Sequence, residues 1–214
     1  RSTLFPYTTL FRSYFLIEGF INRRRETPNG VEGSDGWLFC KADNSVKNFQ
    51  NKILFTDEEL LKIKNNLERV NNWGQKNGIE IVFLIPPDKN RIYGEHFPHK
   101  YKKFNPKSRV QLLKEYLDKN SDINLIYPVD ILINRKKLDD EPLYFKVDTH
   151  WTRVGAYEVY KELIKEINKK TNNNFIPADI NKIDLSKSTF AQQFGCLGDI
   201  CSNMKLKECQ DVTY

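Results

Sequence analysis

The sequence is poor in the residues that build metal centres: among 214 residues it has three histidines and four cysteines. Cys196, Cys201 and Cys209 follow a C-x4-C-x7-C spacing, which differs from the paired C-x2-C of a zinc ribbon. No histidine lies close to them in the sequence. We therefore expect Cys40 and these three residues to be structural thiols or to form one disulfide, and we expect no metal.

Long hydrophobic runs and clustered positive charge are also missing. No stretch reaches the ~20 consecutive apolar residues of a membrane-spanning helix. Residues 14–21 form only a short apolar run, followed closely by three arginines, which indicates either a linker or the remainder of a lost N-terminal membrane anchor. The formal net charge of +6 comes from lysines spread along the chain, not from a basic patch interleaved with aromatic residues. No nucleic-acid partner is therefore expected.

What the sequence does contain is typical of one globular domain. Hydrophobic residues make up 39% of it and aromatic residues 13%, which argues against disorder. Residues 1–13 resemble the translation of a sequencing adapter, and artefacts of this kind are excluded from fold prediction. We expect an artefact over 1–13, a linker or anchor remnant over 14–32, and over 33–214 a partial domain that is incomplete at its C-terminus.

A long amphipathic helix is predicted from Thr56 to the glycine at position 78. Thr56 and Glu59 have the spacing of a capping box, in which each side chain accepts a backbone N–H of the other residue. Gly78 is suited to the left-handed conformation that ends many helices. Apolar residues recur at helical spacing between these two signals and predict one buried face, formed by Leu60, Ile63, Leu67, Val70 and either Trp73 or Gly74.

Two extended segments are predicted to pair in a parallel sheet. Residues 79–85 are almost continuously apolar, as in a central strand covered on both faces, and residues 123–127 form the next strand. A helix that opens at Asn105-Pro106 joins them. Further helices are predicted over 129–137 and from Thr152 to about residue 170. This alternation predicts an α/β fold with a mainly parallel sheet flanked by helices.

Asp148 and His150 are the residues that point to catalysis. They lie two positions apart, just before the helix that Thr152 caps, and in an extended segment residues i and i+2 project to the same side. A carboxylate there can fix the imidazole tautomer, so that the other ring nitrogen acts as a general base on a hydroxyl nucleophile. For an isolated Asp-x-His pair, an ordinary buried histidine at a turn is the better interpretation; here the surrounding motifs decide.

Four motifs, in the same order, resemble the AlgX/AlgJ-like branch of the SGNH hydrolase superfamily, which includes DHHW-type proteins. Residues 148–156 resemble its D-x-H-W…G-A signature, and residues 33–39 resemble its G-x-D-G-W-L-F motif. Residues 87–98 resemble P-x-K-x-x-I-Y-x-x-x-x-P, and residues 198–204 resemble G-D-L-x-x-M-L. Each motif alone is weak, but four in the right order across residues 32–206 are a strong signal.

The resemblance implies an SGNH hydrolase-like (flavodoxin-like) fold and O-acetylation of an extracytoplasmic polysaccharide, such as alginate, through a Ser-His-Asp triad. Carried over by position, Asp148 orients the base and His150 is the base. Order within the family places the nucleophilic serine beyond residue 214, so we expect the chain as given to be inactive. No serine here follows a strand on a G-x-S turn, and Ser202 is the least poor of the candidates, which are Ser186, Ser188 and Ser202.

The resemblance also implies partners and a location. The partners are a polysaccharide acceptor and a membrane-bound O-acyltransferase that supplies the acetyl group, and the domain faces outward, either periplasmic or held at the membrane by an anchor. No cofactor is implied. Two other functions stay open: an acetylesterase with the same triad, and a non-catalytic polysaccharide-binding component of an export complex. A metal-dependent hydrolase is disfavoured, because no further ligand cluster accompanies Asp148 and His150.

Three further residues are assigned to substrate binding. Lys89 and Tyr93 follow the carboxyl end of the strand predicted over 79–85, which is where ligands bind in open α/β sheets. For Lys89 a solvated surface lysine fits the sequence equally well, and for Tyr93 packing is favoured. Trp151 is expected to pack and to form a wall of the site. Other aromatic and histidine side chains are not assigned to the site, namely Trp37, His96 and His99.

Overall fold

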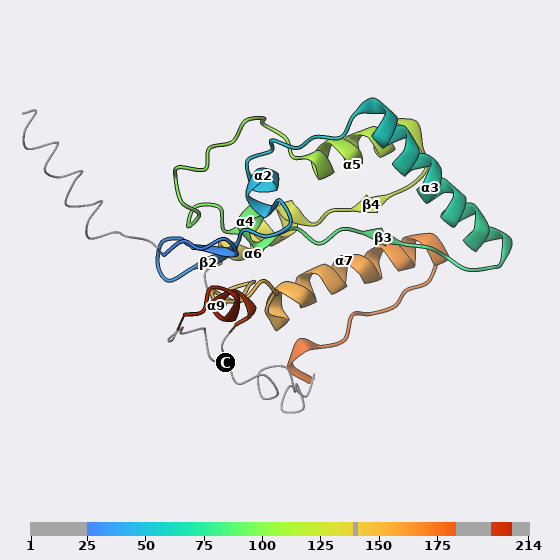
Figure 1. Ribbon diagram of the computed structural model, residues 1–214. Coiled ribbons are helices and arrows are strands. Elements are labelled where there is room, and N and C mark those ends of the chain that lie inside the picture. The colour runs from blue at the N-terminus through green and yellow to red at the C-terminus, as the bar shows by residue number, and fades with distance from the viewer. Residues whose placement is uncertain (1–24, 139–140, 183–197, 207–214) are drawn as a thin grey trace, which may run out of the picture.

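The computed structural model describes residues 25–138, 141–182 and 198–206, in which helices alternate with short strands (Figure 1). The segment that resembles an adapter lies outside these residues. Among the described residues, no helix combines the length and the apolar character needed to cross a bilayer. The alternation agrees with the predicted α/β class.

The strands form two small sheets. β1 (Gly30–Glu32) and β2 (Leu38–Cys40) pair antiparallel, so the motif at residues 33–39 is the turn and second strand of a hairpin. β3 (Phe83–Leu84) and β4 (Leu125–Ile126) pair in parallel, as predicted for these two segments. The parallel pair lies between the helices in Figure 1.

Helix α3 (Asp57–Lys76) forms where the capping box predicts it. Thr56 Oγ1 accepts the backbone N–H of Glu59 at 3.2 Å, and the Glu59 carboxylate accepts the N–H of Thr56 at 2.8 Å. The predicted buried face is wrong at Val70, which is 43% exposed. Of the two alternatives for its last position, Gly74 is buried and Trp73 is 57% exposed. Helix α3 has 20 residues and packs against a helix of 12 residues, so its last turns extend past their apolar neighbour.

The end of α3 explains why the next strand is shorter than predicted. Gly78 has a φ of +68°, and the N–H groups of Gly78 and Ile79 donate back to Gln75 O and Gly74 O, which is a Schellman motif. Ile79 is therefore tied to the helix and cannot begin a strand. Of the predicted strand over 79–85 only β3 forms, and its two residues are half-buried. The expectation of a long strand covered on both faces was wrong.

Helix α5 (Arg109–Asn120) begins later than predicted. Its N-cap is Ser108, whose Oγ accepts the N–H of Gln111 at 3.3 Å. Asn105 instead pairs with Asn51, each side-chain amide donating to the other residue's carbonyl oxygen at 2.7 and 2.8 Å. This reciprocal pair keeps Asn105 out of the helix, so the helix start expected at Asn105-Pro106 was wrong.

The remaining helices are mostly short. The predictions over 129–137 and from Thr152 onward are confirmed by α6 and α7. The full set comprises α2 (Ser45–Phe49), α4 (Lys89–Ile92), α6 (Val129–Lys136), α7 (Arg153–Thr171), the 3-10 turn η1 (Ile180–Lys182) and α9 (Asp199–Asn203).

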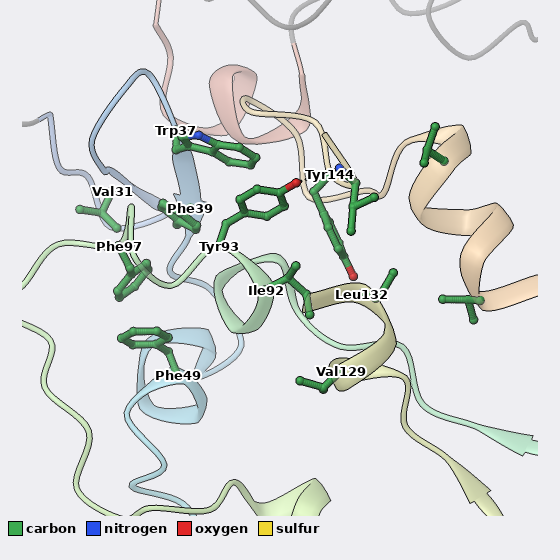
Figure 2. Packing of buried hydrophobic residues seen from close by; sticks show 13 residues of the cluster. Val31, Trp37, Phe39, Phe49, Ile92, Tyr93, Phe97, Val129, Leu132 and Tyr144 are labelled. Carbon is green, nitrogen blue, oxygen red and sulfur yellow. Dashed lines mark hydrogen bonds between the residues drawn. The ribbon is translucent and has the colours of Figure 1, made fainter. Parts of the chain in front are cut away.

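The largest buried cluster is rich in aromatic residues, and Figure 2 shows side chains from the hairpin, α2, α4 and α6 converging in it. The Trp37 and Tyr93 rings stack with centroids 4.1 Å apart. Phe97 meets Phe49 at 4.3 Å and Phe39 edge-on at 4.9 Å. Residues of three predicted motifs thus share one core, which lies against the segment that carries Asp148 and His150.

Candidate active site

Asp148 and His150 are in direct contact. A hydrogen bond of 2.6 Å joins His150 Nδ1 to Asp148 Oδ1, and the backbone N–H of His150 donates to the same oxygen at 2.9 Å. The backbone contact closes an Asx turn, in which an aspartate accepts from the residue two positions on. The segment runs through bends, so the extended conformation expected for it was wrong. A turn, and not the pleat of a strand, brings the two side chains to one side.

Helix α9 holds the second oxygen of the Asp148 carboxylate. The backbone N–H of Asp199 donates to Asp148 Oδ2 at 2.9 Å. The Asp199 carboxylate in turn accepts the backbone N–H of Thr149 at 2.7 Å and the Thr149 hydroxyl. Residues 198–204 were singled out in the sequence as a motif, but only the fold shows that this segment contacts the Asp-x-His segment.

Helix α9 approaches this closely because residue 198 is a glycine. A Cβ atom at position 198 would lie 2.4 Å from Val147 O, and that oxygen also accepts the backbone N–H of Cys201 at 3.2 Å. Val147, Ile200 and Met204 pack together in a small buried cluster. The glycine of the G-D motif is therefore required by backbone packing beside the site.

The hydrogen bonds around Asp148 favour its ionised form. Burial acts to raise the pKa of this carboxyl, but the hydrogen bonds from the backbone N–H groups of Asp199 and His150 and from the His150 ring outweigh it, and the pKa lies below its ordinary value. A permanently ionised carboxylate is what the orienting member of a Ser-His-Asp triad needs.

The residues just after His150 begin α7. Thr152 Oγ1 accepts the N–H of Gly155 at 3.3 Å and donates to Pro142 O at 2.7 Å. A cap of this kind satisfies an N–H group that the helix leaves unpaired. These two hydrogen bonds attach the first turn of α7 to residue 142, which fixes the position of the backbone just after His150.

Lys89 lies on the other side of the Asp-x-His segment. Its side chain is only 5% exposed, and Nζ donates to Phe145 O at 3.1 Å, Lys146 O at 3.0 Å and Asp148 O at 2.6 Å. The rings of two core aromatics lie 5.3 and 5.7 Å from the ammonium. The structure therefore places Lys89 beside the Asp-x-His segment, with its charge directed at the backbone of that segment.

The other two residues assigned to substrate binding differ in their surroundings. Tyr93 is buried, and its hydroxyl accepts the backbone N–H of Leu143 at 2.9 Å, which agrees with the favoured packing role. Trp151 is half-buried and pairs with Tyr144 in an isolated β-bridge. Away from the Asp148–His150 pair, His96 stacks on Trp37 with ring centroids 5.3 Å apart.

A cavity of about 340 Å³ opens beside the pair. It is lined by His150, Thr149 and Trp151, by the two residues before Lys89, which belong to the loop that follows β3, and by Lys89 itself, which begins α4. Its position at the carboxyl end of a parallel strand is the usual place for a ligand in an α/β fold. The full lining consists of Phe39, Cys40, Ser45, Pro86, Pro87, Asp88, Lys89, Asn90, Tyr144, Thr149, His150, Trp151 and Ile200.

Comparison with known proteins identifies the family. A profile described as "SGNH hydrolase-like domain, acetyltransferase AlgX" matches residues 31–207. The chain belongs to this AlgX acetyltransferase family. Its fold is therefore the SGNH hydrolase-like α/β fold that the four motifs predicted.

Two curated relatives of this AlgX-family chain carry the name "Probable alginate O-acetylase AlgJ". The protein of Pseudomonas fluorescens is 31% identical over 158 residues, which cover 70% of this chain and 36% of the relative. That of Pseudomonas aeruginosa is 26% identical over 161 residues, covering 71% of this chain and 36% of the relative. The chain thus spans about a third of the length of these relatives.

Solved structures with similarity to the chain include an AlgJ domain and a protein named PatB1. The "O-Acetyltransferase Domain of Pseudomonas putida AlgJ" aligns with a TM-score of 0.47 and 22% identity, over 70% of this chain and 50% of that one. Bacillus cereus PatB1 aligns with a TM-score of 0.43 and 18% identity, over 71% of this chain and 47% of that one.

The position of the nucleophilic serine, expected beyond residue 214 of this AlgX-family chain, stays a prediction. Ser202 is exposed on α9, and its backbone N–H donates to Gly198 O at 3.0 Å. The other two serines considered, Ser186 and Ser188, lie outside the described residues.

The described part of the chain holds one group of side chains with the geometry of a metal site. Ligand atoms of Asp148, His150 and Asp199 all lie within 4.8 Å of one another. This group could not be predicted from the sequence, because Asp199 is distant from the other two along the chain. Their carboxylate oxygens also accept hydrogen bonds from backbone N–H groups.

Proposed function

We propose that Asp148 is the orienting carboxylate and His150 the base in a Ser-His-Asp centre that O-acetylates an extracytoplasmic polysaccharide. The observation that carries this proposal is the 2.6 Å contact between His150 Nδ1 and Asp148 Oδ1. An ionised Asp148 favours the tautomer with a proton on Nδ1, which makes Nε2 the basic nitrogen.

The reaction would proceed in two covalent steps. A serine hydroxyl from outside the described residues gives its proton to His150 Nε2, and the oxygen attacks the carbonyl carbon of an acetyl donor. The proton then passes to the leaving group, and an acetyl-serine remains. In the second step a sugar hydroxyl gives its proton to Nε2 and attacks the acetyl carbon. Serine leaves and takes back the proton, which restores the neutral base.

The substrate class rests on the relatives. Both are named probable alginate O-acetylases, so we propose a polysaccharide acceptor, with an alginate-like polymer as the first to test. The net charge of +6 is compatible with an acidic polymer. We further propose that a membrane-bound O-acyltransferase supplies the acetyl group.

The proposed location is extracytoplasmic. Cys201, in the helix that contacts Asp148, is disulfide-bonded, whereas Cys40 is a free thiol. Disulfides persist in oxidising compartments such as the periplasm and are rare in the cytosol. The disulfide agrees with one of the two states expected for the cysteines from the sequence, and it supports an outward-facing domain.

Hydrolysis is the second candidate, and the exposure of His150 favours it. The imidazole side chain is 56% exposed, so water reaches the base as readily as a sugar hydroxyl does. If water replaced the sugar in the second step, the same pair would release acetate. The acceptor must therefore be varied in any test of function.

The test uses the protein encoded by the uninterrupted gene, with an activated acetyl ester as donor. We expect acetyl-ester turnover that His150→Ala lowers by about 10²–10⁴-fold, the usual contribution of a general base. His99→Ala is the matched control, since His99 is exposed and does not line the cavity. Adding alginate oligomers should divert acetyl groups from acetate to sugar ester if transfer is the function.

Three other outcomes would change the assignment. Turnover that gives only acetate at every oligomer concentration would assign the protein as an esterase. Equal activity of the His150→Ala and unsubstituted proteins would refute the proposed base. A folded, complete protein that binds alginate but turns over no ester would favour the polysaccharide-binding role.

A further inference from the structure

Lys89 stands out because a buried ammonium group is expensive to keep. Removing a charge from water costs several kcal/mol even after the protein relaxes, and the side chain is 5% exposed. Lys89 is the first residue of the four-residue helix α4 and is far from Asp148 along the chain. The contacts of the Lys89 ammonium with its neighbours explain why a buried charge is kept beside the Asp148–His150 pair.

The ammonium group is saturated by backbone carbonyl groups. An NH3⁺ group has three N–H donors and no acceptor, and Nζ of Lys89 has three carbonyl acceptors within 3.1 Å, on residues 145, 146 and 148. Carbonyl groups that are adjacent in sequence point in different directions in an extended strand. For these three to meet at one point the chain must curl, and the ammonium stabilises the curl.

The curl is the segment that presents the catalytic carboxylate. Asp148 takes part in it through its own carbonyl oxygen, at 2.6 Å from Nζ. Its side chain leaves the same Cα atom to meet His150 and the N–H of Asp199. The orientation of the carboxylate therefore depends on the backbone conformation that Lys89 holds.

Lys89 is itself held on a fixed base. The neighbouring side chain of Asn90 donates to Ser45 Oγ at 3.1 Å, and Arg91 donates to Asn48 O at 2.8 Å. Tyr144, at the start of the curled segment, donates from its hydroxyl to Pro87 O. Both sides of the lysine contact are thus attached to the loop that follows β3, so a displacement of Asp148 relative to α4 would break several bonds together.

We propose that Lys89 is a positioning residue that sets the geometry of the Asp148–His150 pair by binding the backbone carbonyl groups of residues 145–148, and that it does not bind substrate. The inference rests on the proposed function only in naming that pair as catalytic. It replaces the substrate-binding role considered for Lys89 from the sequence, because the three donors of its ammonium are directed at the protein.

The test is made by NMR on this chain, with Lys89→Met as the perturbation. Methionine keeps much of the length of the stem and removes the charge. Exchange of the backbone N–H groups of His150 and Asp199 should become faster by about tenfold or more, as expected when a hydrogen bond to a charged group is lost. The carboxyl carbon of Asp148 should also titrate at higher pH than in the unsubstituted chain, because its hydrogen-bond donors no longer meet it.

Lys146→Met is the matched control. It removes one positive charge from the same segment, but the Lys146 ammonium is directed at the hairpin, where Nζ donates to Asp35 O at 3.3 Å and lies 6.0 Å from the centroid of the Trp37 ring. Exchange at His150 and Asp199 and the titration of Asp148 should match those of the unsubstituted chain. A shift as large as that of Lys89→Met would show that loss of charge alone is responsible, which would overturn the proposal.

A second variant covers the case in which Lys89→Met does not fold. Lys89→Arg keeps the charge, but a planar guanidinium cannot place three N–H donors on one nitrogen as an ammonium group does. The N–H exchange and the titration of Asp148 should therefore change in the same direction as in Lys89→Met. Unchanged values for both readouts in either folded Lys89 variant would refute the positioning role. Neither readout requires acetyl transfer, so such a result would leave the proposed function standing, and failure of the ester assay would leave this inference standing.

Discussion

Gly198→Ala is the substitution for which the structure predicts the most specific result. An added methyl group would lie 2.4 Å from Val147 O, 2.6 Å from Val147 C and 2.9 Å from Val147 Cγ2. Val147 is 2% exposed and packs against Ile200 and Met204, so it has no room to retreat. Ordinary contact needs about 3.5 Å between heavy atoms, so α9 must move away by about 1 Å.

A movement of this size has two separate costs. Overpacking a buried contact lowers the free energy of unfolding by about 1–3 kcal/mol. The N–H of Asp199 would also leave the Asp148 carboxylate, because a 2.9 Å hydrogen bond does not survive a lengthening of about 1 Å. The second cost depends on pH, whereas the first does not.

The sign of the pH dependence follows from Asp148. Its pKa is lowered in the folded protein, so its hydrogen bonds stabilise the fold above the ordinary aspartate pKa of about 3.9. This stabilisation is lost as the pH falls through the lower, folded-state pKa. The difference in unfolding free energy between Gly198→Ala and the unsubstituted chain should therefore be larger at pH 7 than below pH 3.

Urea denaturation at a series of pH values measures this difference. Gly78→Ala is the control: its Cβ meets nothing within 4 Å, and its positive φ predicts a cost of about 1–2 kcal/mol that does not change with pH. The reasoning is refuted if Gly198→Ala costs nothing at pH 7, or if its cost is the same at both ends of the pH range.

Two further predictions concern the support of the site. Tyr93→Phe removes the acceptor of the buried Leu143 N–H, so it should lower the free energy of unfolding by about 1–3 kcal/mol; an unchanged urea midpoint would contradict this. Cys201→Ser should lower the thermal midpoint and remove its sensitivity to reductant, because Cys201 is disulfide-bonded and such a bond contributes about 2–4 kcal/mol. A Cys40→Ser control should keep both properties of the unsubstituted chain.

The features that the sequence predicted well are those determined by neighbours along the chain. The capping box of α3 needs only Thr56 and Glu59, and the start of α7 needs only Thr152 and the turn before it. The parallel pairing of β3 and β4 follows from alternation of helix and strand over a short span. Each of these signals is local, so a sequence pattern carries it in full.

The features that the sequence missed depend on contacts between distant segments. The apolar stripe of α3 continues to Trp73, but the helix that covers it is shorter, which no periodicity reveals. The carboxylate of Asp199 and the ammonium of Lys89 reach the Asp-x-His segment from separate parts of the chain. Their residue types were visible in motifs, whereas their partners are set by the fold.

These distant contacts also explain how the Asp148–His150 pair keeps its geometry on a segment that is neither helix nor strand. Lys89 binds the carbonyl groups on one side of the segment, the N–H of Asp199 meets the carboxylate from another, and the cap of Thr152 fixes the residues that follow. A turn with so few internal hydrogen bonds would otherwise sample many conformations. The three attachments all come from described elements of the chain, so the geometry of the Asp148–His150 pair does not depend on the serine proposed to act with it.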